Sequence, residues 1–224
     1  FEWFAATVGG LGLTGMIVTA RLQLRRVPGP LLDVETQRFD SLSEFHTLSL
    51  GMSESEYAVA WVDCVARGSR LGRGVFMRAD HTAGPSPIAQ TKSFRIPASP
   101  PVSLVNKLSL SLFNSLYFSR APRHPKRKLL HYFPYFYPLD RINNWNILYG
   151  PRGFLQYQRV VPPITAVDAI AELLGRIAAS GQGSFLAVLK QFGHRRGPGL
   201  LSIPRPGTTL ALDFPNRGEA TLRL

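Results

Sequence analysis

The predicted elements of this chain follow one order twice, and that order limits the folds open to it. Each unit has four segments, in which a period of two marks the strands and helical spacing or capping residues mark the helix. The first unit comprises residues 31–39, 41–50, 57–65 and 74–79, and the second comprises residues 154–161, 165–179, 184–192 and 208–214. The order strand–helix–strand–strand predicts an α+β fold, with an antiparallel or mixed sheet and helices packed on one face.

Capping residues mark both predicted helices. Ser41 precedes the first helix with Glu44 three residues later, which is the spacing of a capping box. Thr165 and Asp168 repeat that spacing before the second helix, and Gly181 is suited to end it. The apolar residues of the second helix recur at helical spacing, as Val167, Ile170, Leu174 and Ile177. We expect this apolar face to pack against the sheet.

A glycine-rich stretch precedes the first unit. Gly10, Gly12 and Gly15 form the pattern G-x-G-x-x-G, and apolar and polar side chains alternate over residues 16–24. The alternation predicts a strand, whereas the dinucleotide-binding fingerprint needs a strand before the glycines and a helix after them. The uncharged run at 3–20 is short and glycine-rich for a membrane span, and it lacks the basic start of a signal peptide. We therefore expect a turn followed by a strand.

Two long segments between the units have weaker signals. Residues 80–128 begin rich in proline and serine, and within them residues 102–117 fit either a helix or an extended apolar segment. Residues 129–137 predict an aromatic strand, and residues 138–153 predict a loop. Loops of this length inside a compact domain usually act as lids or are disordered.

The charge of the chain favours an anionic partner. The formal net charge is +12, and arginine outnumbers lysine by 21 to 5. Arginine binds phosphate through two parallel hydrogen bonds, which lysine cannot form. The clearest basic cluster is at 120–128, and a solvated basic face without a ligand would have the same composition. One alternative function is therefore a basic, non-catalytic domain that binds nucleic acid or anionic lipid.

Other classes of protein are excluded by simple counts. Hydrophobic residues make up 45% of the chain and charged residues 18%, which is typical of a globular chain with a core. Cys64 is the single cysteine, so an internal disulfide framework and a thiolate metal cluster are ruled out. The five histidines show no ligand spacing with carboxylates, and the sequence contains neither a G-x-S-x-G elbow nor a P-loop. We expect no metal site.

Several predicted strands carry polar or aromatic side chains on one face. Gln156 and Gln158 share a face and can orient a hydroxyl-rich ligand, although a solvent-facing strand has the same pattern. Lys190 among apolar neighbours is typical of an edge-strand gatekeeper or of a positioned cation. Trp61 fits a core position as well as a site. Further candidates on these faces are Val188, Phe192, Thr209, Ala211 and Asp213.

Taken together, six segments resemble one family. They are ATVGGLGLTGMI (6–17), YAVAWVD (57–63), PLD with WN and YGP (138–151), GFLQYQRVVP (153–162), GSFLAVLKQFG (183–193) and TLALDFP (209–215). In this order they resemble the decaprenylphosphoryl-β-D-ribose 2'-oxidase family, FAD-linked oxidases of the vanillyl-alcohol-oxidase type. The resemblance implies that residues 1–28 end a PCMH-type FAD-binding domain with its terminal strand. Residues 29–224 would form a substrate-binding domain truncated at its C-terminus, and we expect a fragment of a longer protein.

The resemblance also implies a cofactor and a set of contacts. FAD would be contacted by Gly12, Thr14 and Ile17. The substrate pocket would be lined by Trp61, Gln156, Gln158, Val188, Lys190 and Phe192. The implied reaction oxidises a secondary hydroxyl of a polyprenylphosphoryl ribose, with the hydride passing to flavin N5. The catalytic base is expected outside this chain, so we expect the chain alone to be inactive and to hold no FAD.

The implied partners follow from that substrate. They are a lipid-linked sugar phosphate, the membrane surface and a reductase or epimerase, but not nucleic acid. The implied location is cytoplasmic or periplasmic at the membrane periphery, without a transmembrane segment. Ala211 and Thr209 stand where the family has a cysteine and an asparagine, and Ile147 replaces an arginine. Another FAD-linked sugar-lactone or alditol oxidase therefore stays an alternative.

Overall fold

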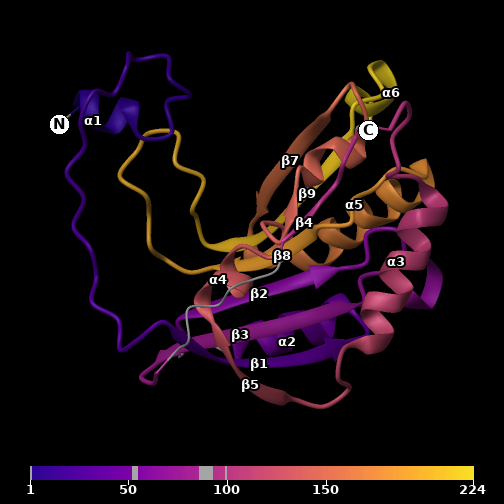
Figure 1. Ribbon diagram of the computed structural model, residues 1–224, viewed down its shortest axis with the longest axis horizontal. Coiled ribbons are helices and arrows are strands. Elements are labelled where there is room, and N and C mark those ends of the chain that lie inside the picture. Colours follow the sequence, from indigo (N-terminus) through magenta and orange to yellow (C-terminus); the bar gives the residue numbers. More distant parts are fainter. Residues whose placement is uncertain (1, 52–54, 86–92, 99) are drawn as a thin grey trace.

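A single antiparallel sheet organises the computed structural model, which describes residues 2–51, 55–85, 93–98 and 100–224 (Figure 1). Its seven strands are β1 (Leu31–Phe39), β2 (Tyr57–Val62), β3 (Gly74–Thr82), β5 (Lys126–His131), β7 (Phe154–Val161), β8 (Ala187–Phe192) and β9 (Gly207–Pro215). They lie in the order β5-β1-β3-β2-β8-β9-β7, and each neighbouring pair is antiparallel. Two short strands, β4 (Phe94–Arg95) and β6 (Ile142–Asn143), pair in parallel outside this sheet.

Helices complete both predicted units, and the α+β class is confirmed. The helices are α1 (Glu2–Thr7), α2 (Leu42–Leu50), α3 (Lys107–Arg120), α4 (Tyr132–Phe136), α5 (Ala166–Ser180) and α6 (Glu219–Leu222). The described residues also contain the 3₁₀ turns η1 (Gly68–Arg70), η2 (Trp145–Tyr149) and η3 (Pro163–Thr165). The units are β1-α2-β2-β3 and β7-α5-β8-β9, and their strands β2 and β8 pair at the centre of the sheet.

The main core lies between the sheet and the helices α2 and α5. Ile170 and Leu174 of α5 are buried with Leu189 and Leu210 of the central strands. The apolar spacing predicted for α5 is confirmed, because Ile170, Leu174 and Ile177 are all buried. Burial of side chains of this size contributes about 1.5–3 kcal/mol each, so this interface is a main source of stability.

The helices of the two predicted units, α2 and α5, share one face of the sheet, and two further helices, α3 and α4, cover part of the other face. Phe118 of α3 packs with Trp61 and Val75 on the face of the sheet away from α5. Tyr135 of α4 packs in the same way against Leu32, near the β1 side of the sheet. Both helices come from segments whose apolar periodicity is weak, and periodicity alone does not say which sheet face a helix covers.

Local capping follows the predictions in part. Ser41 Oγ accepts a hydrogen bond from Glu44 N at 3.2 Å, but Glu44 Oε2 accepts from Asp40 N rather than from Ser41. Thr165 makes no side-chain cap, since α5 begins directly after η3. Gly181 ends α5 with a φ of +71°, a left-handed conformation that glycine adopts without strain.

Two predicted strands are corrected by the structure. Residues 16–24 form no strand, and the exposed Met16 and Leu24 have no sheet edge beside them. Strand alternation needs a partner ladder to become a strand, and no described strand pairs with this segment. The aromatic strand predicted at 129–137 ends at His131, whose Nδ1 accepts from Phe133 N and caps α4.

The two inter-unit segments are also more structured than predicted. Residues 102–117 belong mostly to α3, which Asn106 caps by accepting hydrogen bonds from Leu108 N and Ser109 N. The loop predicted at 138–153 contains β6 and η2. In the proline-rich segment, residues 86–92 and 99 lie outside the described residues, while the rest contains β4.

Cys64 is fully buried in the main core. Its Sγ accepts from Ser184 N and donates to Ser184 O, both at 3.4 Å. Burial raises the pKa of the Cys64 thiol from 9.0 to about 12, mainly because a thiolate would lose its hydration there. The folded state therefore keeps the thiol neutral in a pH range where the unfolded chain releases its proton.

Replacing Cys64 by alanine should therefore reduce the decrease in unfolding free energy that occurs at high pH. The pKa of the Cys64 thiol is higher in the folded chain than in the unfolded chain. Its contribution to the free energy of unfolding is therefore intact below pH 9 and is lost as pH rises toward 12. The difference in unfolding free energy between wild type and Cys64→Ala should fall by about 1.4 kcal/mol between pH 7 and 10. Urea unfolding at both pH values measures it. Tyr149, whose pKa burial also raises to about 12, is common to both proteins and cancels. A constant difference would contradict the assignment.

Candidate functional site

Four adjacent strands bring the predicted substrate-binding residues onto one sheet face. Trp61 of β2 lies opposite Val188 of β8. Val188 lies opposite Ala211 of β9, which in turn lies opposite Gln158 of β7. Directly paired residues of antiparallel strands project from the same face, so these four side chains form a row across the sheet.

Neighbouring rows add the other predicted residues. Lys190 lies opposite Thr209, and Gln156 lies opposite Asp213. Because side chains two residues apart share a face, Phe192 also lies on the side of Val188 and Lys190. The intervening residues, such as Leu189 and Leu210, point into the core under α2 and α5. All six residues predicted to bind substrate therefore share the face opposite those two helices.

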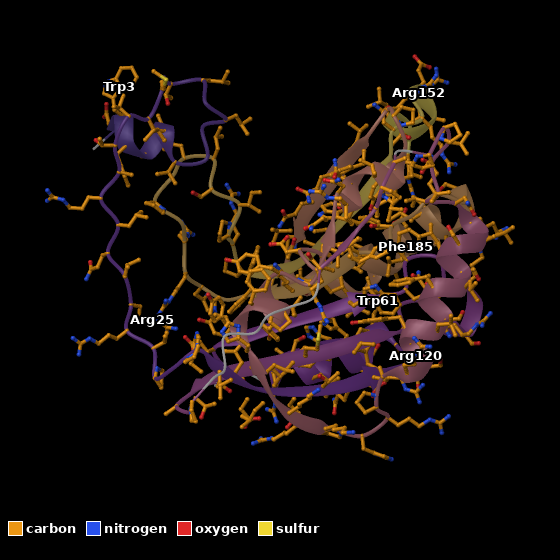
Figure 2. All side chains as sticks on the ribbon, in the orientation of Figure 1. Trp3, Arg25, Trp61, Arg120, Arg152 and Phe185 are labelled. Carbon is orange, nitrogen blue, oxygen red and sulfur yellow. The ribbon has the colours of Figure 1, made fainter. Side chains whose placement is uncertain are left out.

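Trp61 is anchored in the protein rather than exposed on this face. Its Nε1 donates to Phe185 O at 3.0 Å, and both residues are labelled in Figure 2. Its ring meets that of Tyr117 of α3 edge-on, with 4.7 Å between the ring centroids. Its burial favours the core alternative, and its contact with a substrate stays a prediction.

Lys190 occupies an interior strand. The gatekeeper alternative is wrong, because β8 lies between β2 and β9 and presents no free edge. The Lys190 side chain is exposed on the same face as Gln156 and Gln158, which are also exposed. A lysine on an interior strand needs no role in blocking strand pairing, so the positioned-cation alternative is favoured.

A buried carboxylate lies among these groups. Asp213 is only 4% exposed, and among the described residues its Oδ1 has no hydrogen-bond partner. Burial raises the pKa of Asp213, and the amide of Gln156 opposes that shift by hydrogen bonding to the carboxylate. Gln158 Nε2 donates to Thr209 Oγ1 at 3.5 Å. Amides, an ammonium and a carboxylate on one face offer both donors and acceptors, which suits a hydroxyl-rich ligand.

The three predicted cofactor residues are not brought to this face. Gly12, Thr14 and Ile17 belong to the N-terminal segment, which stands apart from β7, β8 and β9 in Figure 1. That segment instead contacts the β8–β9 connection, where Leu200 N donates to Ala5 O at 2.9 Å. Ile17 is 68% exposed, and a Cβ on Gly12 would meet nothing within 4 Å. These residues therefore enclose no cavity of flavin size within the described chain.

Neither a metal-binding cluster nor a membrane-spanning helix occurs among the described residues. They contain no group of three or more histidine, cysteine, aspartate or glutamate side chains that could hold a metal ion. Among the same residues, none of the helices combines the length and apolar character that crossing a membrane requires.

A basic cavity outside this face has no counterpart among the sequence-based predictions. Arg67, Arg70 and Arg73 of the β2–β3 connection line it together with α3. The available signal was the spacing of three between these arginines and the spacing of four between Lys107 and Ser111. These two segments meet only through tertiary packing.

The fold is that of an α+β domain built on an antiparallel sheet, one face of which carries amide, ammonium and carboxylate side chains. No protein-family model matches the chain. The chain is 31% identical over 227 residues to a decaprenylphosphoryl-β-D-ribose oxidase of Mycolicibacterium smegmatis, covering 96% of this chain and 48% of that protein. It is 33% identical over 239 residues to an uncharacterised protein in the mprA 5' region of Streptomyces coelicolor, covering 99% of this chain and 64% of that protein.

The resemblance indicated by the motifs is thus confirmed along nearly the whole chain. The chain is related to the decaprenylphosphoryl-β-D-ribose oxidase family, and it spans about half the length of the first of these relatives. The division at residue 28 and the roles of the individual site residues stay predictions.

Proposed function

We propose that this chain supplies the sugar-binding part of an FAD-dependent oxidoreductase that oxidises a secondary hydroxyl of a polyprenylphosphoryl ribose. The observation that carries the proposal is the gathering of all six predicted substrate residues on one sheet face. The similarity to a named ribose oxidase over 96% of the chain supports the choice of substrate class. A lipid-phosphoryl pentose combines hydroxyl groups with a phosphate, and the face offers partners for both.

Each group on the face has a proposed task. Gln156 and Gln158 accept from and donate to the sugar hydroxyls, because each amide has a donor group and an acceptor oxygen. Lys190 supplies a positive charge for the phosphate. Val188 and Phe192 give the sugar ring an apolar surface between these polar groups.

The redox step is not assigned to residues of this chain. In an enzyme of this kind, flavin supplies the hydride acceptor. Gly12, Thr14 and Ile17 form no flavin-sized cavity within the described residues, so we assign to this chain the binding and orientation of the sugar. Contact with a membrane surface and with a reductase or epimerase belongs to the same proposal.

The substitution Lys190→Met tests the proposal. It is made in a longer protein that contains this chain and matches its relatives in length. Loss of a charge-assisted contact should raise KM or slow flavin reduction by about tenfold or more. Flavin absorbance during single-turnover reduction by the lipid-phosphoryl sugar measures the effect. Arg159→Met is the matched control, since Arg159 lies opposite Leu210 and so projects from the other face. Unchanged kinetics for Lys190→Met, or a protein without flavin, would contradict the proposal.

A further inference from the structure

The geometry points to a phosphate-binding site at the end of the sheet where β2 passes to β3, distinct from the sheet face described above. A cavity of about 180 Å³ lies there between the β2–β3 connection, α3 and the end of α5. This is several times the roughly 30 Å³ that one water occupies in the liquid, so a phosphate group fits. Its polar lining includes Arg67, Arg70, Arg73, Lys107, Ser111 and Ser115.

The cationic side chains converge for local reasons. Arg67 and Arg70 flank and end the 3₁₀ turn η1, in which side chains three residues apart lie on the same side. Gly68, with a φ of +60°, permits the left-handed backbone at the start of that turn. Lys107 and Ser111 are four residues apart on α3, and Ser115 follows after four more, so one helix face carries all three.

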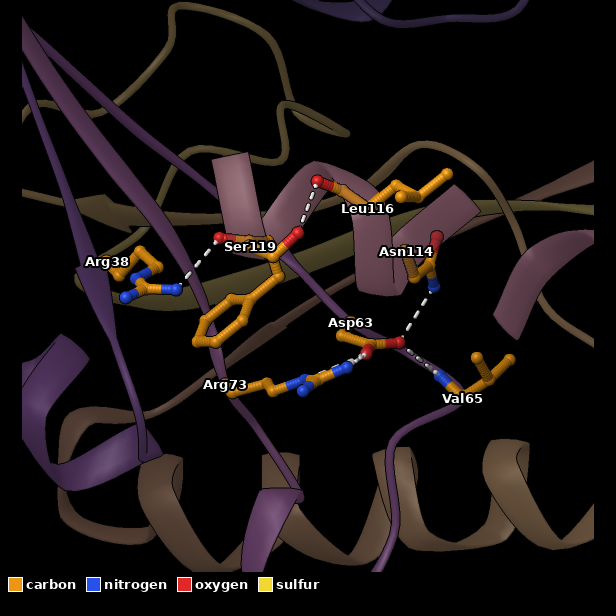
Figure 3. A network of polar contacts seen from close by, with 8 residues as sticks. Arg38, Asp63, Val65, Arg73, Asn114, Leu116 and Ser119 are labelled. Atoms are coloured by element: carbon orange, nitrogen blue, oxygen red, sulfur yellow. Dashed lines mark hydrogen bonds and ion pairs between the residues drawn. The ribbon is translucent and has the colours of Figure 1, made fainter. Parts of the chain in front are cut away.

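Arg73 is held in a fixed orientation beside the cavity. Its Nε and Nη2 donate to Asp63 Oδ2 at 3.0 and 2.7 Å, and its guanidinium lies over the Phe118 ring at 4.6 Å (Figure 3). The Nη1 group is not used in that ion pair. A fixed guanidinium loses little side-chain freedom when it binds an anion, which favours recognition of phosphate.

Among the described residues, Asp63 is the one carboxylate that lines the cavity. Both of its oxygens already accept hydrogen bonds. Asp63 Oδ1 accepts from Asn114 Nδ2 at 2.8 Å and from Val65 N at 3.3 Å, while Oδ2 is paired with Arg73. Four cationic side chains therefore face one neutralised carboxylate, and the cavity is electropositive.

Structural roles account for only part of this arrangement. Arg67 Nη2 donates to Ala178 O near the end of α5, and Arg73 neutralises the buried Asp63. Arg70 and Lys107 are exposed at the cavity, and two like charges that line one cavity do not stabilise the fold by attraction. A phosphate group accounts for all of them, because its oxygens accept from guanidinium, ammonium and serine hydroxyl groups.

The phosphate group has two sources, a soluble phosphorylated sugar or a lipid headgroup. Next to the Lys107–Ser111–Ser115 face, α3 exposes Leu108, Leu112 and Leu116 to solvent. This apolar strip lies where an acyl or prenyl chain would extend from a bound headgroup. Both kinds of phosphate would bind the same cavity side chains, but only a lipid would also contact the apolar strip. Variants of the cavity and of the strip therefore distinguish the two sources.

Binding measurements on this chain test the site. Isothermal titration with inorganic phosphate and with ribose 5-phosphate should show saturable binding that weakens about tenfold or more in the double variant Arg70→Gln/Lys107→Gln. The matched control, Arg195→Gln/Arg196→Gln, removes the same charge from the exposed β8–β9 connection and should bind as wild type. All four substituted side chains are exposed, so unchanged circular dichroism and urea midpoints are expected.

Co-sedimentation with vesicles containing phosphatidic acid identifies the source. If the cavity variant and Leu112→Gln both weaken vesicle binding, the site holds a lipid phosphate. If neither changes it while soluble phosphate binding is lost in the cavity variant, the site holds a soluble phosphate. Absence of saturable binding to every probe, or equal weakening in the control variant, overturns the proposal. These outcomes are independent of the flavin experiment.

Discussion

Replacing Asp63 by alanine should lower the free energy of unfolding by about 3–5 kcal/mol, because it removes one partner of a buried ion pair. Asp63 is 2% exposed and accepts hydrogen bonds from Arg73, Asn114 and Val65 (Figure 3). Without the carboxylate, the Arg73 guanidinium and the fully buried Asn114 amide both lose their acceptor. Urea unfolding at neutral pH, followed by circular dichroism, measures the loss.

Two comparisons show whether burial is the cause. Glu172→Ala removes an exposed carboxylate that pairs with Arg176 one helical turn away, and it should change stability by no more than about 0.5 kcal/mol. Asp63→Asn keeps the shape and one acceptor oxygen, so its loss should lie between the two. A loss below about 1 kcal/mol for Asp63→Ala would show that this network is not a source of stability.

Phe39→Ala should destabilise the chain by about 3–5 kcal/mol through the cavity it leaves in the main core. Phe39 is 1% exposed, and its ring lies 5.6 Å from that of Phe45 of α2. It lies opposite Gly74 in the β1–β3 ladder, where a Cβ would come within 2.3 Å of the Phe39 ring. Because Gly74 has no side chain, the Phe39 ring fits beside it. A smaller residue at position 39 would leave that space empty.

The matched control for this core substitution is Phe94→Ala. Phe94 lies in the two-residue strand β4 and is 67% exposed, so the same truncation should cost less than about 0.5 kcal/mol. Chemical unfolding of the two variants side by side is the measurement. Equal losses would mean that the loss reflects phenylalanine removal in general rather than burial at residue 39.

Features with local signals were predictable. The apolar spacing of Ile170 and Leu174 predicts α5 and its buried face, and Gly181 predicts its end. Alternation predicts β7 with its observed bounds, and the strand–helix–strand–strand order predicts both units. Each of these signals depends on residues a few positions apart, which is the range over which helix and strand periodicity act.

Features that depend on partners distant in the sequence were not predictable. Residues 16–24 alternate like a strand, yet no described strand pairs with them, so the alternation has no ladder to support it. Lys190 looks the same on an edge strand as on an interior one, and only the pairing of β8 with both β2 and β9 separates the two cases. The sheet face covered by α3 could not be predicted either, because Leu108, Leu112 and Leu116 of this helix are exposed although Leu110 is buried.

The candidate sites likewise combine residues that the sequence singles out with an arrangement that depends on the fold. Gln156, Gln158 and Lys190 were selected from strand periodicity and family resemblance, but their common face depends on the order β8-β9-β7. The basic cavity joins η1 to α3, segments almost 40 residues apart, and neither segment alone suggests a site. Asp63 likewise finds its partners Arg73 and Asn114 only in the folded chain.

From the sequence alone one can predict the order of elements within the two units, the buried face of α5 and the relationship to a ribose oxidase family, since these follow from near-neighbour patterns and from shared segments. The central position of particular strands, the face that each helix covers and the convergence of the cationic side chains could be seen only in the folded chain. Those outcomes come from long-range pairing and packing, which the periodicity of a single segment does not encode.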